Sequence, residues 1–468
     1  MRAVIALISL ASIGAAPPST DARLRQIVAP VRGAKMKQTV ATLVSFGTRH
    51  TLSSHTDPRR GIGAALTWTK GQFESFGLST VKPCETFTGA RVPQPTPVCD
   101  MVAVQLGTER PNDVVIITGH IDSRVTDVMN ATSDAPGAND DGSGTAAVIE
   151  AARVLSKHKF AGTIVYAALS GEEQGLYGGK VLANYAKAQG SNVVANLNND
   201  IIGNSCGSDG VCNAKVVRVF SEGPRWQGHD ELAKQIRSLG GENDAPSRNI
   251  SRFLASLAGR LNIGLDVMQV WRNDRFGRGG DHTEFLNAGY PGVRFSVAVE
   301  NYNWQHQDLR TEKGIKYGDT IENMDFPYLE KITKLNSAAL AAIASAPPPP
   351  APKVEGAVST DTTVTWSQVP GAASYKVWWR RTDSNQWAVS RTVAGAPRCA
   401  PSRETRASAD NVFVDVGPCK LVLPHIRVDD WVFGVSSVSK DGFESPVASA
   451  VPGGAFKPYV APPAEPVK

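Results

Sequence analysis

The chain has 468 residues, of which 41% are hydrophobic and 20% are charged. This is the composition of a globular protein with a large core, and the length predicts two or three domains. The net charge of +5 is spread along the chain without a run of five or six like charges. The sequence therefore gives no support to nucleic-acid binding or to attachment to an anionic membrane.

The N-terminal stretch "MRAVIALISLASIGAAPPST" has one arginine, an apolar run from Ala3 to Ala16, and then small residues. This pattern predicts a secretory signal peptide over residues 1–16, although Pro17 is unfavourable directly after a cleavage point. The run is too short for a membrane anchor, which needs about 20 apolar residues. We therefore expect an exported protein, periplasmic or extracellular, without a membrane span.

Residues 22–345 alternate between strand and helix patterns. Four short runs, apolar along nearly their whole length, predict strands that are covered on both faces; they are "DVVIITGH" (113–120), "GTIVYAALS" (162–170), "NVVANLNND" (192–200) and "PGVRFSVAVE" (291–300). Between them, residues 143–158 place apolar side chains at helical spacing, with Ser143 or Asp141 as the cap. We expect an α/β domain with a mostly parallel sheet and helices on both faces.

A proline-rich segment predicts the boundary between this domain and a second one. The run 346–353 follows an alanine-rich helical pattern over 328–346 and should form a stiff linker. Beyond it, residues 354–452 alternate polar and apolar side chains around turn signals, which predicts an all-β sandwich. This part resembles fibronectin type III modules at Trp366, Tyr375 and "DWVFGVSSVSKDGFES". Residues 453–468 are expected to form a tail.

The six cysteines fall into three pairs that are close in sequence. Since the chain is expected to be exported, three disulfides are the simplest interpretation. The pairs are Cys84–Cys99, Cys206–Cys212 and Cys399–Cys419.

Acidic and imidazole side chains follow each predicted strand of the α/β domain. Because ligands bind beyond the carboxyl ends of parallel strands, these residues should meet at one edge of the sheet. In chain order they are His120 and Asp122, Asp140 and Asp141 in "GANDDGSGTAA", Glu172 and Glu173 in "GEEQG", Asp200, and Glu300 and His306 in "VENYNWQHQD". So many carboxylates would repel one another unless a cation neutralised them.

Histidine mixed with carboxylates is a ligand set that suits zinc. Five ligands with one bridging carboxylate can hold two Zn²⁺ ions and leave one glutamate of "GEEQG" free. A free glutamate can take a proton from water and later pass it to a leaving amine. The pattern therefore predicts a two-zinc hydrolase.

With these motifs, residues 100–345 resemble the two-zinc aminopeptidases of the bacterial leucyl aminopeptidase type, a family shared with glutaminyl cyclases and glutamate carboxypeptidases. The resemblance rests on "GHIDS", "PGANDDGSG", "LSGEEQGLYGG", "NLNND" and, less closely, "NYNWQHQD". It implies that Asp140 bridges two zinc ions and precedes a cis peptide bond. It further implies that His120 and Asp200 complete one zinc site, that Glu173 and His306 complete the other, that Glu172 is the general base, and that Asp122 orients His120.

The last histidine ligand has a competitor in "GRGGDHTEF", where Asp281 and His282 stand at an expected helix start. The family pattern contains both features and favours His306 as the ligand, with Asp281 and His282 beside the cleft. The tyrosine that many members carry before the Asp-His pair is absent, and Arg275 or Arg278 could polarise the substrate carbonyl instead. "GNSCG" (203–207) mimics a serine-hydrolase motif but lacks the expected helix after it, so Ser205 is rejected as a nucleophile.

The resemblance implies an aminopeptidase that hydrolyses peptides with a metal-activated water. Two alternatives from the same family stay open, a one-zinc glutaminyl cyclase and a carboxypeptidase. A non-enzymatic adhesion protein is a third alternative, suggested by the sandwich module.

Overall fold

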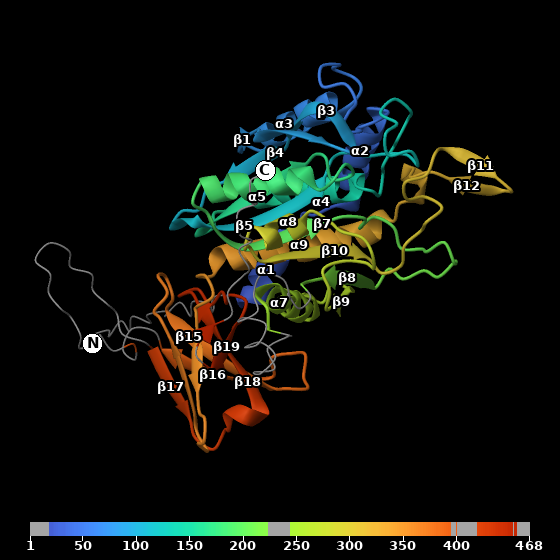
Figure 1. The fold of residues 1–468 in the computed structure, drawn as a ribbon. Coiled ribbons are helices and arrows are strands. Elements are labelled where there is room, and N and C mark those ends of the chain that lie inside the picture. The colour runs from blue at the N-terminus through green and yellow to red at the C-terminus, as the bar shows by residue number, and fades with distance from the viewer. Residues whose placement is uncertain (1–17, 223–243, 395–398, 400–418, 453, 456–468) are drawn as a thin grey trace, which may run out of the picture.

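The structure is a computed structural model that describes residues 18–222, 244–394, 399, 419–452 and 454–455. The predicted signal peptide and nearly all of the predicted tail lie outside these residues. The described part forms an α/β domain followed by a C-terminal β module (Figure 1). None of the helices in the described part combines the length and the apolar character needed to cross a membrane.

An eight-stranded sheet forms the centre of the α/β domain, and its strand order is β1-β4-β6-β5-β7-β10-β8-β9. The pairs β6–β5, β5–β7, β7–β10 and β8–β9 are parallel, and the other pairs are antiparallel. The strands are β1 (Ser79–Val81), β4 (Met101–Gln105), β5 (Arg110–His120), β6 (Gly162–Leu169), β7 (Asn192–Asn199), β8 (Val216–Phe220), β9 (Asp266–Val270) and β10 (Gly292–Val297). This confirms the predicted fold class, since the four apolar runs are β5, β6, β7 and β10.

Helices cover both faces of the sheet because successive side chains of each strand point to opposite sides. In β5, Val115 and Ile117 belong to the larger buried cluster, whereas Val114 and Ile116 belong to a smaller one on the other face. The larger cluster packs under α1 (Thr20–Val28), α2 (Gly33–Ser45), α3 (Ile62–Ser75), α4 (Gly142–Leu155), α7 (Pro246–Leu261) and α9 (Phe326–Ser345). The smaller cluster packs under α5 (Tyr177–Ala188) and α8 (His282–Asn287).

Two hairpins and one short helix complete the domain: β2 (Cys84–Gly89) with β3 (Val92–Cys99), β11 (Arg310–Glu312) with β12 (Ile315–Tyr317), and η2 (Ile321–Asn323). The β11–β12 hairpin projects from the body of the molecule (Figure 1). All three predicted disulfides are formed, Cys84–Cys99, Cys206–Cys212 and Cys399–Cys419.

The C-terminal module is built from β13 (Lys353–Glu355), β14 (Thr362–Trp366), β15 (Ser374–Arg381), β16 (Val389–Ala394), β17 (Cys419–Leu423), η3 (Val428–Asp430), β18 (Trp431–Val438), β19 (Ala448–Pro452) and β20 (Gly454–Ala455). Apart from the parallel pair β13–β19, these strands pair antiparallel. Its core contains Trp366 and Tyr375, whose rings meet edge to face with centroids 5.4 Å apart. The resemblance to fibronectin type III modules stays a prediction.

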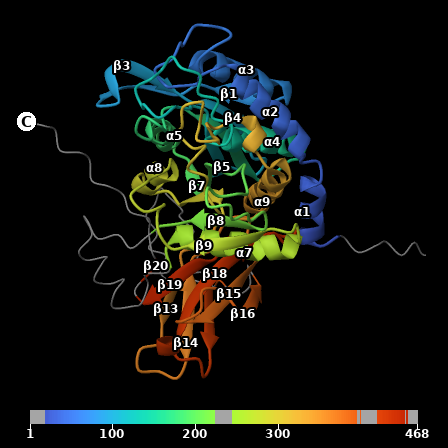
Figure 2. The same ribbon diagram turned by 90° about the vertical axis from the view of Figure 1, so that its right-hand side faces the viewer.

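The module packs against the α/β domain beside α7 (Figures 1 and 2). Asp244, just before α7, accepts hydrogen bonds from Arg380 (2.7 Å) and from Ser449 (2.9 Å) of the module. Asn249 in α7 bonds Ser449 at 2.9 Å and Trp387 at 3.3 Å. The connecting prolines Pro347 and Pro350 are themselves buried. The segment predicted as a linker is therefore packed against the protein along part of its length.

The ion pair between Arg380 and Asp244 carries our first expectation, because both side chains are only 1% exposed. Replacing Arg380 with alanine removes the nearer cation of the buried Asp244 carboxylate and leaves it the more distant Arg252 at 3.9 Å, which should lower the free energy of unfolding by about 3 kcal/mol. The control is Arg381→Ala, since the Arg381 side chain is 66% exposed and its loss should change stability by about 0.5 kcal/mol or less. Urea unfolding of the two variants measures the difference, and equal stabilities would show that the interface contributes little.

Candidate metal centre

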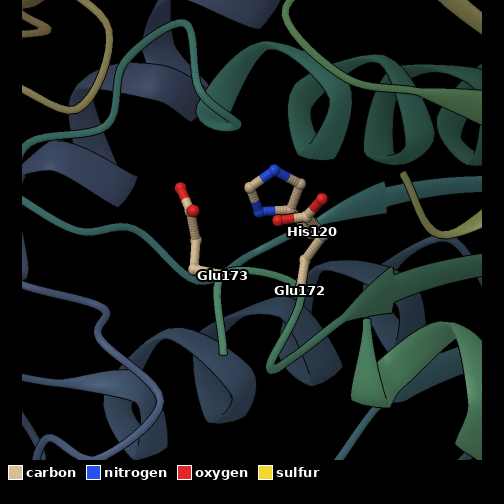
Figure 3. Close-up of side chains that lie close together, drawn as sticks. All are labelled: His120, Glu172 and Glu173. Atoms are coloured by element: carbon tan, nitrogen blue, oxygen red, sulfur yellow. The ribbon is translucent and has the colours of Figure 1, made fainter. Parts of the chain in front are cut away.

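The candidate site lies at the carboxyl ends of the parallel strands. His120 is the last residue of β5, Asp200 directly follows β7, and Glu172 and Glu173 stand in the loop after β6. Figure 3 shows the His120 ring at the end of its strand beside the two glutamates. The predicted convergence of His120, Asp140, Glu172, Glu173, Asp200 and His306 is thus present in the structure, because each belongs to a group of side chains close enough to share a metal ion.

The start of α4 is pressed against the end of β5, and glycines make this close approach possible. A Cβ on Gly119 would lie 2.4 Å from the backbone of Gly144, which is closer than any side chain allows. Asp141 caps α4 by accepting from the Gly144 amide at 2.8 Å, and its other oxygen accepts from the His120 amide at 3.0 Å. The peptide bond Asp140–Asp141 is cis. Asp141 therefore joins the helix start to the strand end, while Asp140 is left facing the site.

One group of ligand atoms consists of His120, Asp140 and Asp200. His120 Nε2 lies 3.2 Å from Asp140 Oδ1 and 3.7 Å from Asp200 Oδ1. The other oxygen of Asp200 is held at 2.8 Å by Arg294, a fully buried arginine that also pairs with Asp274 at 2.5 Å. Arg294 thus fixes the Asp200 carboxylate with one oxygen turned towards His120.

A second group consists of Asp140, Glu173 and His306. His306 Nε2 lies 2.8 Å from Asp140 Oδ2 and 2.9 Å from Glu173 Oε1. Arg124 lies behind both partners, with Nε 2.8 Å from Glu173 Oε2 and Nη2 2.6 Å from His306 Nδ1. Since a guanidinium only donates, this arrangement suits an imidazole whose proton is on Nε2. A metal ion at Nε2 would replace that proton, and Arg124 would have to release Nδ1.

Glu172 stands apart from these contacts. A carboxylate oxygen of Glu172 lies within 4.8 Å of ligand atoms of both His120 and Glu173. No hydrogen bond or ion pair within the described residues engages this carboxylate, which is only partly buried. Its carboxylate lies beside the His120 ring (Figure 3) and is free to accept a proton.

Two further carboxylates position the ligands. The Asp122 carboxylate accepts hydrogen bonds from the backbone amides of Glu172 (3.3 Å) and Glu173 (3.2 Å). It also lies 3.4 Å from His120 Nδ1, although the backbone carbonyl of Asp122 is closer to that nitrogen, at 3.1 Å. Asp319 accepts from the amides of Asn139 and Asp140, the latter at 2.7 Å. The loops that carry Glu172, Glu173 and Asp140 are thus fixed by side-chain hydrogen bonds to their backbones.

The electrostatics of the site follow from burial and from the mixture of charges. Burial lowers the pKa of His120, but Glu172 and the neighbouring aspartates outweigh it and raise that pKa well above its usual value. Burial raises the pKa of Glu172 well above normal, and Glu173 adds to the effect. Burial also acts to raise the pKa of Asp140, yet His306 and His120 hold it well below normal. Asp200 likewise has a lowered pKa because Arg294 outweighs its burial.

The unsatisfied atoms of the site test whether zinc fits. His120 Nε2, Glu173 Oε1 and Asp200 Oδ1 are buried without a hydrogen-bond partner among the described residues. Buried polar atoms are normally satisfied, and all three belong to the groups just described. Imidazole nitrogen and carboxylate oxygen together are the donor set that zinc accepts. The residues therefore fit zinc.

A cleft of about 590 Å³ opens above these residues. Arg275 and Arg278, predicted to be near the site, line this cleft. Asp281 and His282 are buried and are not among its lining residues. The start of α8 turns them inwards, where Asp281 accepts from the Gly179 amide at 3.1 Å and His282 Nε2 lies 2.7 Å from the Asn273 carbonyl. Burial raises the pKa of Asp281 to about 7.

Sequence reasoning missed Arg294, Arg124 and Asp319. Arg294 had a usable signal, because it is the one charged residue within the apolar run "GVRFSV" and a buried strand charge needs a partner. Arg124 follows "GHIDS" directly but resembles any surface arginine in sequence. Asp319 in "KYGDT" carries no local signal. The rejected Ser205 lies outside any helix or strand, and its hydroxyl donates to Asp325 at 2.6 Å.

The sequence and the fold were compared with those of known proteins. Residues 101–335 match the model of peptidase family M28. A probable zinc metalloprotease of Pyrenophora tritici-repentis is 40% identical over 93% of this chain and 88% of its own length. Another from Leptosphaeria maculans is 39% identical over 94% of this chain and all of its own length. Among solved structures, the LapA aminopeptidase of Legionella pneumophila is 18% identical, with a TM-score of 0.49 and coverage of 74% of this chain and 80% of its own.

Proposed function

Given that the chain belongs to peptidase family M28 and is a zinc metalloprotease, we propose that it is a two-zinc aminopeptidase that removes N-terminal residues from peptides. The choice of the peptide N-terminus follows from the resemblance of the five sequence motifs to two-zinc aminopeptidases. The ligand geometry supports two zinc ions.

The position of Asp140 is the observation that carries this proposal. Its two carboxylate oxygens face different imidazoles, Oδ1 that of His120 and Oδ2 that of His306. A carboxylate shared in this way can hold two metal ions about 3.5–4 Å apart. Asp200 would complete the set of His120, and Glu173 would complete the set of His306. Each ion would then have three protein ligands, which leaves room for water and substrate.

Zinc, when bound, supplies a Lewis acid that makes water a stronger acid near neutral pH and polarises a carbonyl. Glu172 would take the proton of the attacking water and return it to the leaving amine. Its carboxylate is free of other partners, and burial has raised its pKa in the direction a base at neutral pH requires. Asp122 holds the amides of Glu172 and Glu173 and so keeps the base in register with the metal ligands.

The wider organisation is part of the proposal. Residues 1–16 would be removed as a signal peptide on export to the periplasm or the medium, which agrees with three disulfides in one chain. Residues 22–345 would act as the peptidase domain. The module of residues 354–452 would stabilise that domain, because Arg380 and Ser449 bond its buried Asp244.

Hydrolysis of aminoacyl-nitroanilides by the metal-loaded and the chelator-treated protein tests the proposal. We expect activity that disappears after dialysis against a chelator and returns with zinc, because zinc supplies the Lewis acid that activates the attacking water. Activity that survives full metal removal, verified by elemental analysis, would refute the mechanism. Release of ammonia from N-terminal glutamine peptides without hydrolysis would instead identify a glutaminyl cyclase.

A further inference from the structure

A second hollow of about 470 Å³ adjoins the catalytic cleft, and its lining is strongly basic. Arg275, Arg278 and Tyr302 line both the cleft and the hollow and thus form the wall between them. Arg218 and Arg272 add two more guanidinium groups on the far side, and Glu300 is the only carboxylate in the described lining. Four cations therefore face one anion next to the place where a substrate would be cut.

Glu300 organises these arginines without neutralising them. Its carboxylate is 4% exposed and pairs with Arg218 at 2.5 Å, with Arg275 at 3.1 Å and with Arg278 at 3.3 Å. Glu300 thus contacts three guanidinium groups, and Asp274 additionally holds Arg275 Nε at 3.0 Å. The arginines around Glu300 keep a net positive charge, and their hydrogen-bond donors are already held in place, which favours binding of an anion.

Several guanidinium donors remain available. Within the described residues, Arg272 makes no side-chain hydrogen bond or ion pair, and Arg278 uses only Nη1, towards Glu300 and Gln305. Arg275 uses Nε and Nη1, which leaves Nη2 unpaired. Arg272 and Arg278 are exposed and line the hollow, so a bound anion could reach their guanidinium groups there, whereas the Arg275 side chain is only 9% exposed.

We propose that this basic hollow, defined by Arg218, Arg272, Arg275 and Arg278, is a subsite for a carboxylate of the peptide substrate. The inference rests on the proposed peptidase function and adds a substrate class, peptides with a negative charge close to the cleaved bond. Planar guanidinium groups pair with planar carboxylates through two parallel hydrogen bonds. The carboxylate can come from an acidic side chain or from the C-terminus of a short peptide, and the two sources differ in the test below.

Binding to the full-length, zinc-loaded Glu172→Gln protein measures the preference without cleavage. Calorimetry compares amidated tripeptides that carry glutamate or glutamine at the first, second or third position. A further pair, Leu-Ala-Ala with a free or an amidated C-terminus, tests the other carboxylate source. We expect one of these matched pairs to show about tenfold tighter binding of the charged form, as a charge-assisted hydrogen bond gives. The preference should shrink in 1 M salt, where screening is stronger.

Arg272→Gln, added to the same protein, should reduce that tenfold ratio to about threefold or less. The matched control is Arg381→Gln, which removes the same charge from the exposed edge of the C-terminal module and should leave the ratio unchanged. Thermal unfolding of both variants verifies that they fold. Ratios near one for every matched pair, or a tenfold ratio that Arg272→Gln does not alter, would overturn the subsite. Failure of the unmodified enzyme to cleave any peptide would instead overturn the peptidase function, and the binding ratios would still be measurable.

Discussion

Glu172→Gln is expected to lower kcat for peptide hydrolysis by about 10²–10⁴-fold while zinc content stays unchanged. The amide keeps the shape of the side chain but cannot accept the proton of the attacking water. Zinc should remain because the two sets of ligand atoms around Asp140 do not include Glu172. Steady-state kinetics together with elemental analysis measure both quantities.

The control for this variant is Glu109→Gln, which makes the same chemical change at a carboxylate that is 64% exposed. Its kcat should equal that of the unmodified enzyme. A Glu172→Gln protein with normal kcat would exclude Glu172 as the base. One that has lost zinc would make Glu172 a ligand, as its closeness to His120 and Glu173 also permits.

Asp140→Asn is expected to weaken zinc binding at both positions by more than about 100-fold, since loss of a group that merely supports a ligand already costs about 10–100-fold. Both carboxylate oxygens of Asp140 face a ligand histidine, at 3.2 Å and 2.8 Å. The matched variant Asp200→Asn should affect one position only, because Asp200 approaches His120 and not His306. Zinc titration followed by elemental analysis would give close to zero ions for Asp140→Asn and about one for Asp200→Asn. Equal losses in the two variants would exclude Asp140 as a bridge.

The parallel sheet and the main candidate residues could be predicted because they share one local pattern, an apolar run that ends in a charged residue. His120 and Asp200 each directly end or follow such a run, and parallel strands bring their carboxyl ends together. His306 was named among the side chains beyond the strand run 291–300, but its choice as the ligand over His282 came from the family resemblance. Its backbone has a positive φ of 56°, which no pattern of hydrophobic residues reveals.

Long-range partners could not be predicted, because they depend on distances that a sequence does not contain. Asp319 holds the amide of Asp140, 179 positions earlier in the chain. Arg380 reaches Asp244 across a separation of 136 positions. The proline-rich run was predicted to be a linker from composition alone, and composition does not tell whether buried prolines such as Pro347 pack against a neighbouring surface.

The reacting groups are gathered from strand ends and loops that are distant in the chain, from His120 to His306, and no single segment holds more than a fragment of the centre. Catalytic activity consequently requires the complete fold. A chain that is still being synthesised, or is locally unfolded, has its acidic side chains apart and cannot hydrolyse a substrate. The folding reaction itself therefore keeps an unfolded copy of the chain inactive.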